Sequence, residues 1–144
     1  MKKIMVGIGL IVVGVSFTFF VLNNKYTIAK ENFSVYALET GVFENKEKAL
    51  KFVKNLPSYI IVESDGLYKV YSAIYKNIDI INEMVVYLEN KDILVYLKSI
   101  DVTKEFYNEL LNYEKIITNN YNENIYDQVN QSILNTYIES QKYD

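Results

Sequence analysis

The sequence predicts an α+β protein held in a membrane. Its parts are an N-terminal transmembrane helix, a four-stranded antiparallel βαββαβ sheet with two helices on one face, and a C-terminal helical extension. Three observations predict this: an uncharged apolar run near the N-terminus, a strand-helix-strand pattern that occurs twice, and two amphipathic patterns near the C-terminus. The predicted boundaries are a cytoplasmic stub at 1–3, the transmembrane anchor at 4–22, a stalk at 23–32, the α+β domain at 33–101 and the helical extension at 102–140.

The apolar run begins at Ile4, ends at Leu22 and contains no charged residue. As a helix it would reach about 28 Å, close to the roughly 30 Å of a bilayer's hydrocarbon core. Lys2 and Lys3 precede it, so the positive-inside rule predicts a cytoplasmic N-terminus and an extracytoplasmic C-terminus. Residues 27–29 form a competing signal-cleavage pattern. That pattern lies well past the run, and signal sequences usually have a shorter apolar region, so we expect an uncleaved single-pass anchor in the cell membrane.

Composition excludes several functional classes. The chain has 144 residues, with 50% hydrophobic and 23% charged residues, which suits about one folded domain with small extras. It has no cysteine and no histidine, so disulfides, thiolate nucleophiles, Ser-His-Asp triads and Cys- or His-ligated metals are ruled out. No glycine-rich phosphate loop or calcium-binding loop occurs. We therefore expect no enzymatic activity, no cofactor and no metal.

Charge narrows the expected partners. The net charge of the chain is −3. Without Lys2, Lys3 and Lys25, the outer part keeps 12 basic against 18 acidic residues, which is about −6. Such a balance opposes nucleic acid, anionic lipid and anionic wall polymers as partners, and it leaves neutral sugars and proteins. Lys46, Lys48, Lys51 and Lys54 are interpreted as one solvated helix flank.

The first strand-helix-strand unit follows the stalk. Residues 33–38 are rich in aromatic and β-branched side chains and predict a strand, which Gly41 interrupts. Asn45 is a plausible N-cap for the next helix, and Pro57 ends it. The apolar positions with helical spacing are Ala49, Phe52, Val53 and Leu56. Residues 59–63 predict the second strand.

The second unit repeats this order. A turn at Ser64, Asp65 and Gly66 joins the second strand to a third at 67–74, because Asp-Gly is a strong hairpin signal. A helix at 77–89 and a strand at 93–100 complete a repeat of about 35 residues. Four strands and two crossover helices in this order give one antiparallel sheet. The expected apolar face of the helix is Ile78, Ile81, Val85 and Leu88.

Two amphipathic helices are predicted after the sheet. Residues 103–117 carry a stripe of Phe106, Leu110, Tyr113 and Ile117. Asn119 and Asn120 break the pattern. Residues 121–139 form the second helix, with an expected apolar side at Ile125, Val129, Ser132 and Ile133. Both helices need a surface to pack on, which is the sheet domain, a partner or another copy of the chain.

The repeat resembles the SPOR domain family over residues 33–100. That family opens with a strand, Gln, one residue, Gly, one residue and Phe, followed by a helix that carries Ala. The matching residues are Leu38, Glu39, Thr40, Gly41, Val42 and Phe43, followed by Asn45, Lys48 and Ala49. The run Asp65, Gly66, Leu67, Tyr68, Lys69 and Val70 is similar to the third strand of the family. This sequence departs from the pattern at Glu39, Val42 and Ala73, where the family often has Gln, a small polar residue and Gly.

The resemblance implies a function. SPOR domains bind peptidoglycan, notably glycan strands stripped of stem peptides at bacterial division or sporulation septa, and do not catalyse. They bind through the sheet face away from the helices. Carried over to this chain, the implied glycan-binding residues are Glu39, Val42, Leu67, Lys69 and Tyr71. The implied partners are peptidoglycan glycan strands or, as the alternative, another envelope protein contacted by a SPOR-like scaffold that has lost glycan binding.

Strand alternation distinguishes these two hypotheses. It predicts an unusually apolar outer face made of Phe33, Val35, Ala37, Glu39, Leu67, Lys69 and Tyr71, with Tyr68, Val70, Ser72 and Ile74 facing the helices. If the outer face is a ligand groove, Tyr71 stacks on sugar while Lys69 and Glu39 form hydrogen bonds. If a C-terminal helix covers the face instead, its burial is structural. An open face favours glycan binding, and a face covered by residues 121–139 favours the interaction protein.

Overall fold

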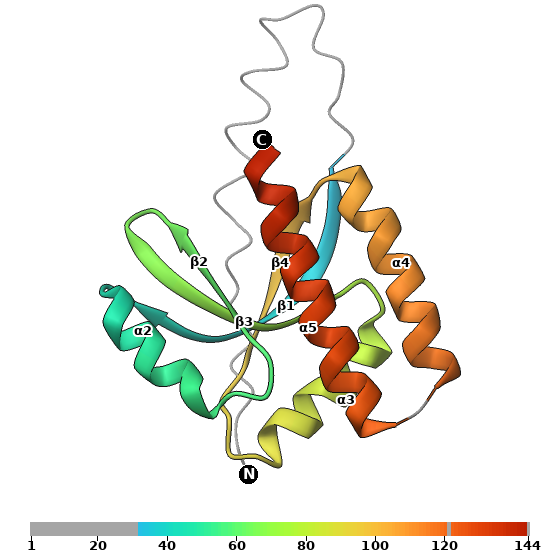
Figure 1. Ribbon diagram of the computed structural model, residues 1–144, viewed down its shortest axis with the longest axis horizontal. Helices are drawn as coiled ribbons and strands as arrows, with labels where there is room; N and C mark the ends of the chain where they lie inside the picture. Colours follow the sequence, from blue (N-terminus) through green and yellow to red (C-terminus); the bar gives the residue numbers. More distant parts are fainter. Residues whose placement is uncertain (1–31, 121, 144) are drawn as a thin grey trace, which may run out of the picture.

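The computed structural model describes residues 32–120 and 122–143, which form four strands followed or separated by helices (Figure 1). The first half contains β1 (Phe33–Phe43), α2 (Lys46–Phe52), the short 3₁₀ helix η1 (Val53–Asn55) and β2 (Ile60–Ser64). The second half contains β3 (Leu67–Tyr75), α3 (Ile78–Glu89), β4 (Tyr96–Val102), α4 (Lys104–Asn119), α5 (Glu123–Ser140) and the 3₁₀ helix η2 (Gln141–Tyr143). The predicted anchor lies outside these residues. Within them, no helix is both long enough and apolar enough to cross a bilayer.

The four strands form one antiparallel sheet in the order β2-β3-β1-β4. The two central strands, β1 and β3, each begin one strand-helix-strand unit. The connection from β1 to β2 therefore passes β3, and the connection from β3 to β4 passes β1. The predicted α+β class and the predicted antiparallel sheet are therefore confirmed, together with the C-terminal helices.

The hairpin and the first helix begin where the sequence predicts. Asp65 and Gly66 have φ angles of 55° and 74°, as the tight turn between β2 and β3 requires. Asn45 caps α2, because its side chain accepts a hydrogen bond from the backbone N–H of Glu47 at 2.7 Å. Ala49 and Val53 of this helical segment form a buried cluster with Val70 of β3, which confirms that Val70 faces the helix.

Strand β1 runs further than predicted, and its partner β3 changes phase relative to the expectation. It continues through Gly41 to Phe43. Ala37 pairs with Ile74 and Glu39 pairs with Tyr71, while β1 pairs with β4 without a shift from Phe33 to Glu39, so Ala37 and Glu39 share one face with their partners on β3. The predicted outer face of Val35, Ala37, Glu39 and Tyr71 is therefore confirmed, and the predicted position of Ile74 on the face of α2 is wrong, because the pairing skips Ser72 and reverses the alternation of β3. The register between the strands is a long-range property, and strand alternation alone does not fix it.

Two local irregularities, at Ser72 of β3 and at Thr40 of β1, affect the middle of the sheet. The pairing shifts on either side of Glu39, which is paired with Tyr71. At this point the Thr40 hydroxyl lies 3.4 Å from the Val70 carbonyl oxygen and 3.2 Å from the Ser72 hydroxyl oxygen. The Gly-x-Phe segment thus begins directly after a bulge that changes the direction in which the side chains point.

The second helix and last strand differ from the prediction in detail. Ile81 and Leu88 of α3 are buried as expected, but Ile80 and Met84 are buried in place of Val85, and Ile78 is exposed. Strand β4 begins at Tyr96, three residues after the predicted start at Ile93. Asp92 has a φ of 59°, and the Ile93 N–H donates to the Leu88 carbonyl at 3.0 Å, so the chain first closes the end of α3.

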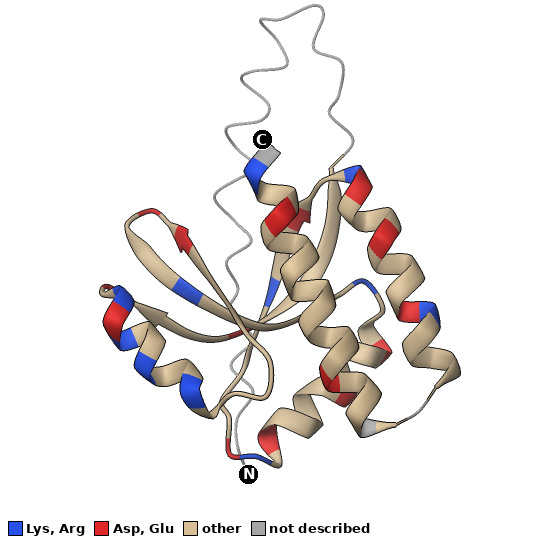
Figure 2. Ribbon diagram, viewed as in Figure 1, with Lys and Arg blue, Asp and Glu red and all other residues tan. Residues whose placement is uncertain are grey.

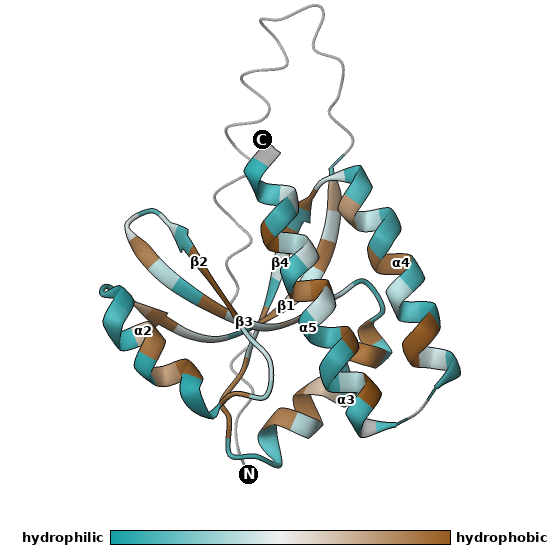
Figure 3. Ribbon diagram, in the orientation of Figure 1, coloured by the Kyte–Doolittle hydropathy of each residue, from teal (hydrophilic) through white to brown (hydrophobic). Residues whose placement is uncertain are grey.

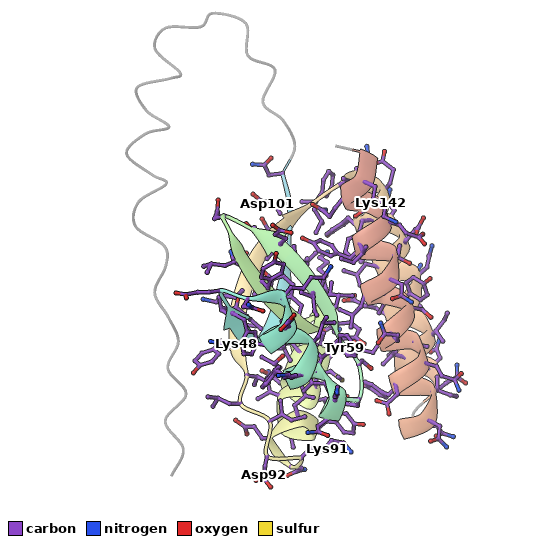
Figure 4. All side chains as sticks on the ribbon, turned by 60° about the vertical axis from the view of Figure 1, so that its left-hand side comes forward. Lys48, Tyr59, Lys91, Asp92, Asp101 and Lys142 are labelled. Atoms are coloured by element: carbon purple, nitrogen blue, oxygen red, sulfur yellow. The ribbon has the colours of Figure 1, made fainter. Side chains whose placement is uncertain are left out.

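Helices α4 and α5 pack against each other as a layer beside the sheet (Figure 4). Thr103 caps α4, with its hydroxyl oxygen accepting from the Phe106 N–H at 3.2 Å. The predicted α4 stripe is confirmed at Phe106, Leu110 and Ile117, which are buried. The predicted α5 stripe is partly wrong. Ser132 is exposed, and the buried residues of α5 are Asn130, Ile133, Leu134 and Tyr137.

Gly41 is required by close packing. A Cβ atom at this position would lie 2.7 Å from the Phe43 ring and 3.3 Å from the Phe52 ring, and these two rings pack with centroids 5.1 Å apart. We predict that Gly41→Ala lowers the free energy of unfolding by about 1–3 kcal/mol, because the added methyl group displaces Phe43 from its contact with α2. Urea unfolding followed by circular dichroism measures this. Gly66→Ala is the control variant. Gly66 has a φ of 74° and nothing lies within 4 Å of its Cβ position, so this change introduces backbone strain but no steric clash.

Candidate functional site

The five residues implied by the resemblance come from two adjacent strands, and the sheet register brings them together. Val42 of β1 is paired with Lys69 of β3, and Glu39 is paired with Tyr71. Leu67 precedes Lys69 by two residues and therefore lies on the same side of β3. The resemblance thus selected residues that are neighbours across β1 and β3.

These residues differ in how accessible they are. Tyr71 and Glu39 are buried, with exposed fractions of 6% and 7%. Val42 is 45% exposed, and Leu67 and Lys69 are half-buried. The predicted site therefore has a buried half at Glu39 and Tyr71 and an accessible half, which we call the hairpin corner, at Val42, Leu67 and Lys69.

Helix α5 covers the buried half. Six consecutive residues of β3, from Val70 to Tyr75, are buried, so both faces of this strand are covered. Val70 packs with α2 on one face. Tyr71 lies on the other face with Glu39, within electrostatic reach of Tyr137 of α5. At the end of β3, the Tyr75 phenol donates to Asn130 Oδ1 of α5 at 3.0 Å. Figures 1 and 4 both show α5 crossing the sheet at β3.

Asn130 connects α5 to the centre of the sheet. It is 1% exposed, and its Nδ2 donates to the Ser72 carbonyl at 2.7 Å while its Oδ1 accepts from Tyr75. Gln131, the next residue, makes a second link, because its amide accepts from the Tyr59 N–H at 3.2 Å and donates to the Tyr59 carbonyl at 3.1 Å. Two adjacent side-chain amides thus satisfy backbone groups beside the strands, as a neighbouring strand would.

A buried carboxylate connects α4 to the end of β3. Glu114 is 8% exposed, and its Oε1 accepts from the N–H groups of Lys76 at 2.6 Å and Asn77 at 2.9 Å. These N–H groups lie in the turn that leads into α3, where backbone donors otherwise lack partners. Asn130 and Glu114 were both missed at the sequence level. Asn130 lies three and four residues before the apolar Ile133 and Leu134, on the same side of α5. This helical spacing was the only feature of the sequence that indicated its burial.

Burial also affects the tyrosines of this face. Burial raises the pKa of Tyr71 from its usual 10.0 to about 12, and the charges of Glu39 and Tyr137 add to the rise. Burial likewise raises the pKa values of Tyr75 and Tyr137. The Glu39 carboxylate lies 3.9 Å from the Lys98 ammonium on β4, so its charge is partly compensated from the other neighbouring strand.

The arrangement supports packing better than chemistry. In the described part of the chain, every buried side-chain nitrogen or oxygen has a hydrogen-bond partner. Within the same residues, no three metal-ligating side chains gather at one point. No protein-family model matches this chain, and no curated protein or solved structure matches it. The roles of the five residues in glycan binding therefore stay predictions.

Removing the Asn130 amide should weaken the attachment of α5. We predict that Asn130→Ala lowers the free energy of unfolding by about 2–4 kcal/mol, since it leaves the Ser72 carbonyl and the Tyr75 phenol buried with one partner fewer and opens a small cavity. Chemical unfolding measures the change. Asn112→Ala, at an exposed position of α4, is the matched control and should change stability by less than about 0.5 kcal/mol. Equal effects of the two variants would contradict the structural role of Asn130.

The raised pKa of Tyr71 predicts a loss of stability at alkaline pH. The folded state holds the phenolic proton more tightly than the unfolded state. Its stabilising contribution is therefore complete below pH 10 and is lost as the pH rises from about 10 to about 12. Tyr71→Phe removes this ionisation and keeps the ring, so it should lose less stability than the wild type between pH 8 and pH 11. Unfolding curves at the two pH values measure the difference, and identical losses would contradict the assignment.

Proposed function

We propose that this chain is a membrane-anchored extracytoplasmic interaction protein. In this proposal a SPOR-like sheet serves as a scaffold for α4 and α5 and contacts another envelope protein, without binding glycan through the centre of its outer face. The observation that carries it is the position of α5 on the face of β3 where a glycan strand would lie. Tyr71, the proposed stacking residue, is buried there, and Asn130 is bonded to the strand beneath.

The extent of the packing also supports this proposal. Ile133 and Leu134 of α5 and Leu110 and Ile117 of α4 are almost completely buried in the same core as the sheet residues Leu38 and Ile74. Full burial of four aliphatic side chains contributes about 6–12 kcal/mol by transfer free energy, before entropy is counted. A glycan would have to displace a helix that forms part of the core.

The membrane attachment belongs to the same proposal. Residues 4–22 form the anchor, residues 1–3 stay in the cytoplasm, and the stalk at 23–32 leads to the domain outside. This arrangement rests on the uncharged run and on Lys2 and Lys3. In this proposal α2 and α3 lie on one face of the sheet, because crossover connections between parallel strands are right-handed. Helix α3 also contacts α5, since the Tyr87 phenol donates to Asp127 Oδ1 at 3.0 Å and the Tyr126 phenol donates to Glu83 Oε2 at 2.7 Å.

Glycan binding at the hairpin corner is the second candidate. It is favoured by the accessibility of Val42, Leu67 and Lys69, which lie beyond the part of β3 that α5 covers. A sugar ring would contact Val42 and Leu67, and the Lys69 ammonium would donate hydrogen bonds to its hydroxyl groups. This surface lacks an aromatic ring at its exposed positions, so it offers a weaker platform than stacking would.

Sedimentation with purified cell wall tests the proposed function. The full chain in detergent is mixed with intact peptidoglycan and with amidase-treated peptidoglycan, which lacks stem peptides. We expect the pelleted fraction to stay at the level of tubes without wall in both cases, because the stacking residue is covered. Pelleting that prefers the treated wall would contradict the proposal.

A pair of variants identifies the surface if such binding is found. The double variant Val42→Ser and Lys69→Ala alters the hairpin corner, and Lys115→Ala removes an exposed lysine from α4 as the control. Binding lost in the double variant alone would replace the proposed function by the second candidate. Binding that survives in both variants would contradict both assignments of the binding surface.

A further inference from the structure

The structure concentrates positive charge on α2 and η1. Within residues 46–55 there are four lysines, Lys46, Lys48, Lys51 and Lys54, and a single carboxylate, Glu47. All four lysines are exposed. Figure 2 shows this segment as the main cluster of blue on a ribbon where red bands predominate elsewhere. The average charge of the outer part, which opposes an anionic partner, therefore hides a local surface of the opposite sign.

These lysines carry uncompensated charge. Among the residues that the structure describes, none of the four lies within 4.0 Å of a carboxylate, and the ion pair that is formed there joins Lys98 to Glu39 instead. Because exposed lysines without partners repel one another, the cluster costs some stability in isolation. An anionic surface brought against α2 would relieve that repulsion.

Two apolar side chains flank the lysines. Ala49 and Val53 face the core, so Lys51 lies nearly opposite to them around the helix. Leu50 and Phe52 lie on either side of Lys51, and they are 45% and 37% exposed. Figure 3 shows hydrophobic residues beside hydrophilic ones along α2. We call the set Lys48, Leu50, Lys51, Phe52 and Lys54 the α2 surface.

We propose that the α2 surface docks on anionic lipid of the membrane that holds the anchor. At a lipid interface, apolar side chains enter the acyl boundary and ammonium groups meet phosphates, and the α2 surface exposes both kinds of side chain next to each other. A soluble polyanion would use the lysines and leave Leu50 and Phe52 in water. The inference rests on the proposed membrane anchor.

The dimensions allow this contact. The eleven residues of β1 span about 33 Å from the end of the stalk to the segment that leads into α2. A stalk of ten residues reaches up to about 34 Å when extended. A domain that lies with β1 along the bilayer therefore brings both the stalk and α2 to the membrane surface.

Site-specific fluorescence tests the docking. The chain has no cysteine, so Leu50→Cys provides one site for an environment-sensitive fluorophore. The full chain is placed in nanodiscs that contain a spin-labelled, quenching lipid, with either neutral phosphatidylcholine alone or added phosphatidylglycerol. We expect strong quenching in the anionic discs, weak quenching in the neutral discs, and loss of quenching in 0.5 M salt. A label at Asn112→Cys on α4 is the matched control and should stay unquenched.

Charge reversal locates the contact. The triple variant Lys48→Glu, Lys51→Glu and Lys54→Glu is compared with Lys104→Glu, Lys115→Glu and Lys142→Glu, which changes the net charge equally at exposed lysines elsewhere. Since each lysine near an anionic surface contributes about fivefold, the first variant should lower the ratio of docked to undocked protein by at least about a hundredfold. The second should leave the quenching within about twofold of the original. Equal losses in both variants would overturn the α2 surface as the docking site.

The same samples separate the two proposals. A chain that fails to co-elute with discs in high salt lacks the anchor, so the proposed attachment fails. A chain that co-elutes while the Leu50→Cys label stays unquenched, or is quenched equally by neutral lipid, keeps its anchor and overturns the docking alone.

Discussion

The contact between the Asn130 amide and strand β3 is the interaction on which the rest of this structure depends. Strand β3 is buried on both faces, and a backbone carbonyl or a phenol enclosed in this way must find a hydrogen-bond partner. One amide provides for both, because it donates to the Ser72 carbonyl and accepts from the Tyr75 phenol. Helix α5 can lie on the sheet because this polar contact is satisfied at the centre of an otherwise apolar interface.

The covered face limits which surfaces of the sheet can bind a partner. Residues matched through the resemblance are register partners, with Val42 opposite Lys69 and Glu39 opposite Tyr71. The sheet register therefore places these residues next to one another. Its central residues nevertheless serve the core, and only the hairpin corner faces solvent. An interface with another protein or with lipid then has to use surfaces that α5 leaves open.

The distribution of charge follows a similar logic. A net charge describes a surface only when the charges are evenly mixed, and here they are not (Figure 2). Lys48, Lys51 and Lys54 of the α2 segment lie on the side away from the core, while Glu114 is used inside the molecule to cap the turn after β3. A buried carboxylate counts toward the net charge of the chain, but it contributes less to the electrostatic potential at the surface than an exposed one. The surface near α2 is thus more basic than the net charge of the chain suggests.

Local sequence signals determined most of the fold of the described residues. Asp65 and Gly66 specify a tight turn, Asn45 and Thr103 cap helices, and the apolar spacing of α4 gives its buried stripe, because these effects act over a few residues. Only the tertiary structure decided the change of phase at Ser72 of β3, the late start of β4 and the stripe of α5. Register depends on pairing between distant residues, and a buried Asn130 is favourable only when Ser72 and Tyr75 are beside it. The same reason explains the candidate site. The sequence could name Tyr71 and Lys69 together, but whether a helix covers one and leaves the other in water is decided by packing across the whole domain.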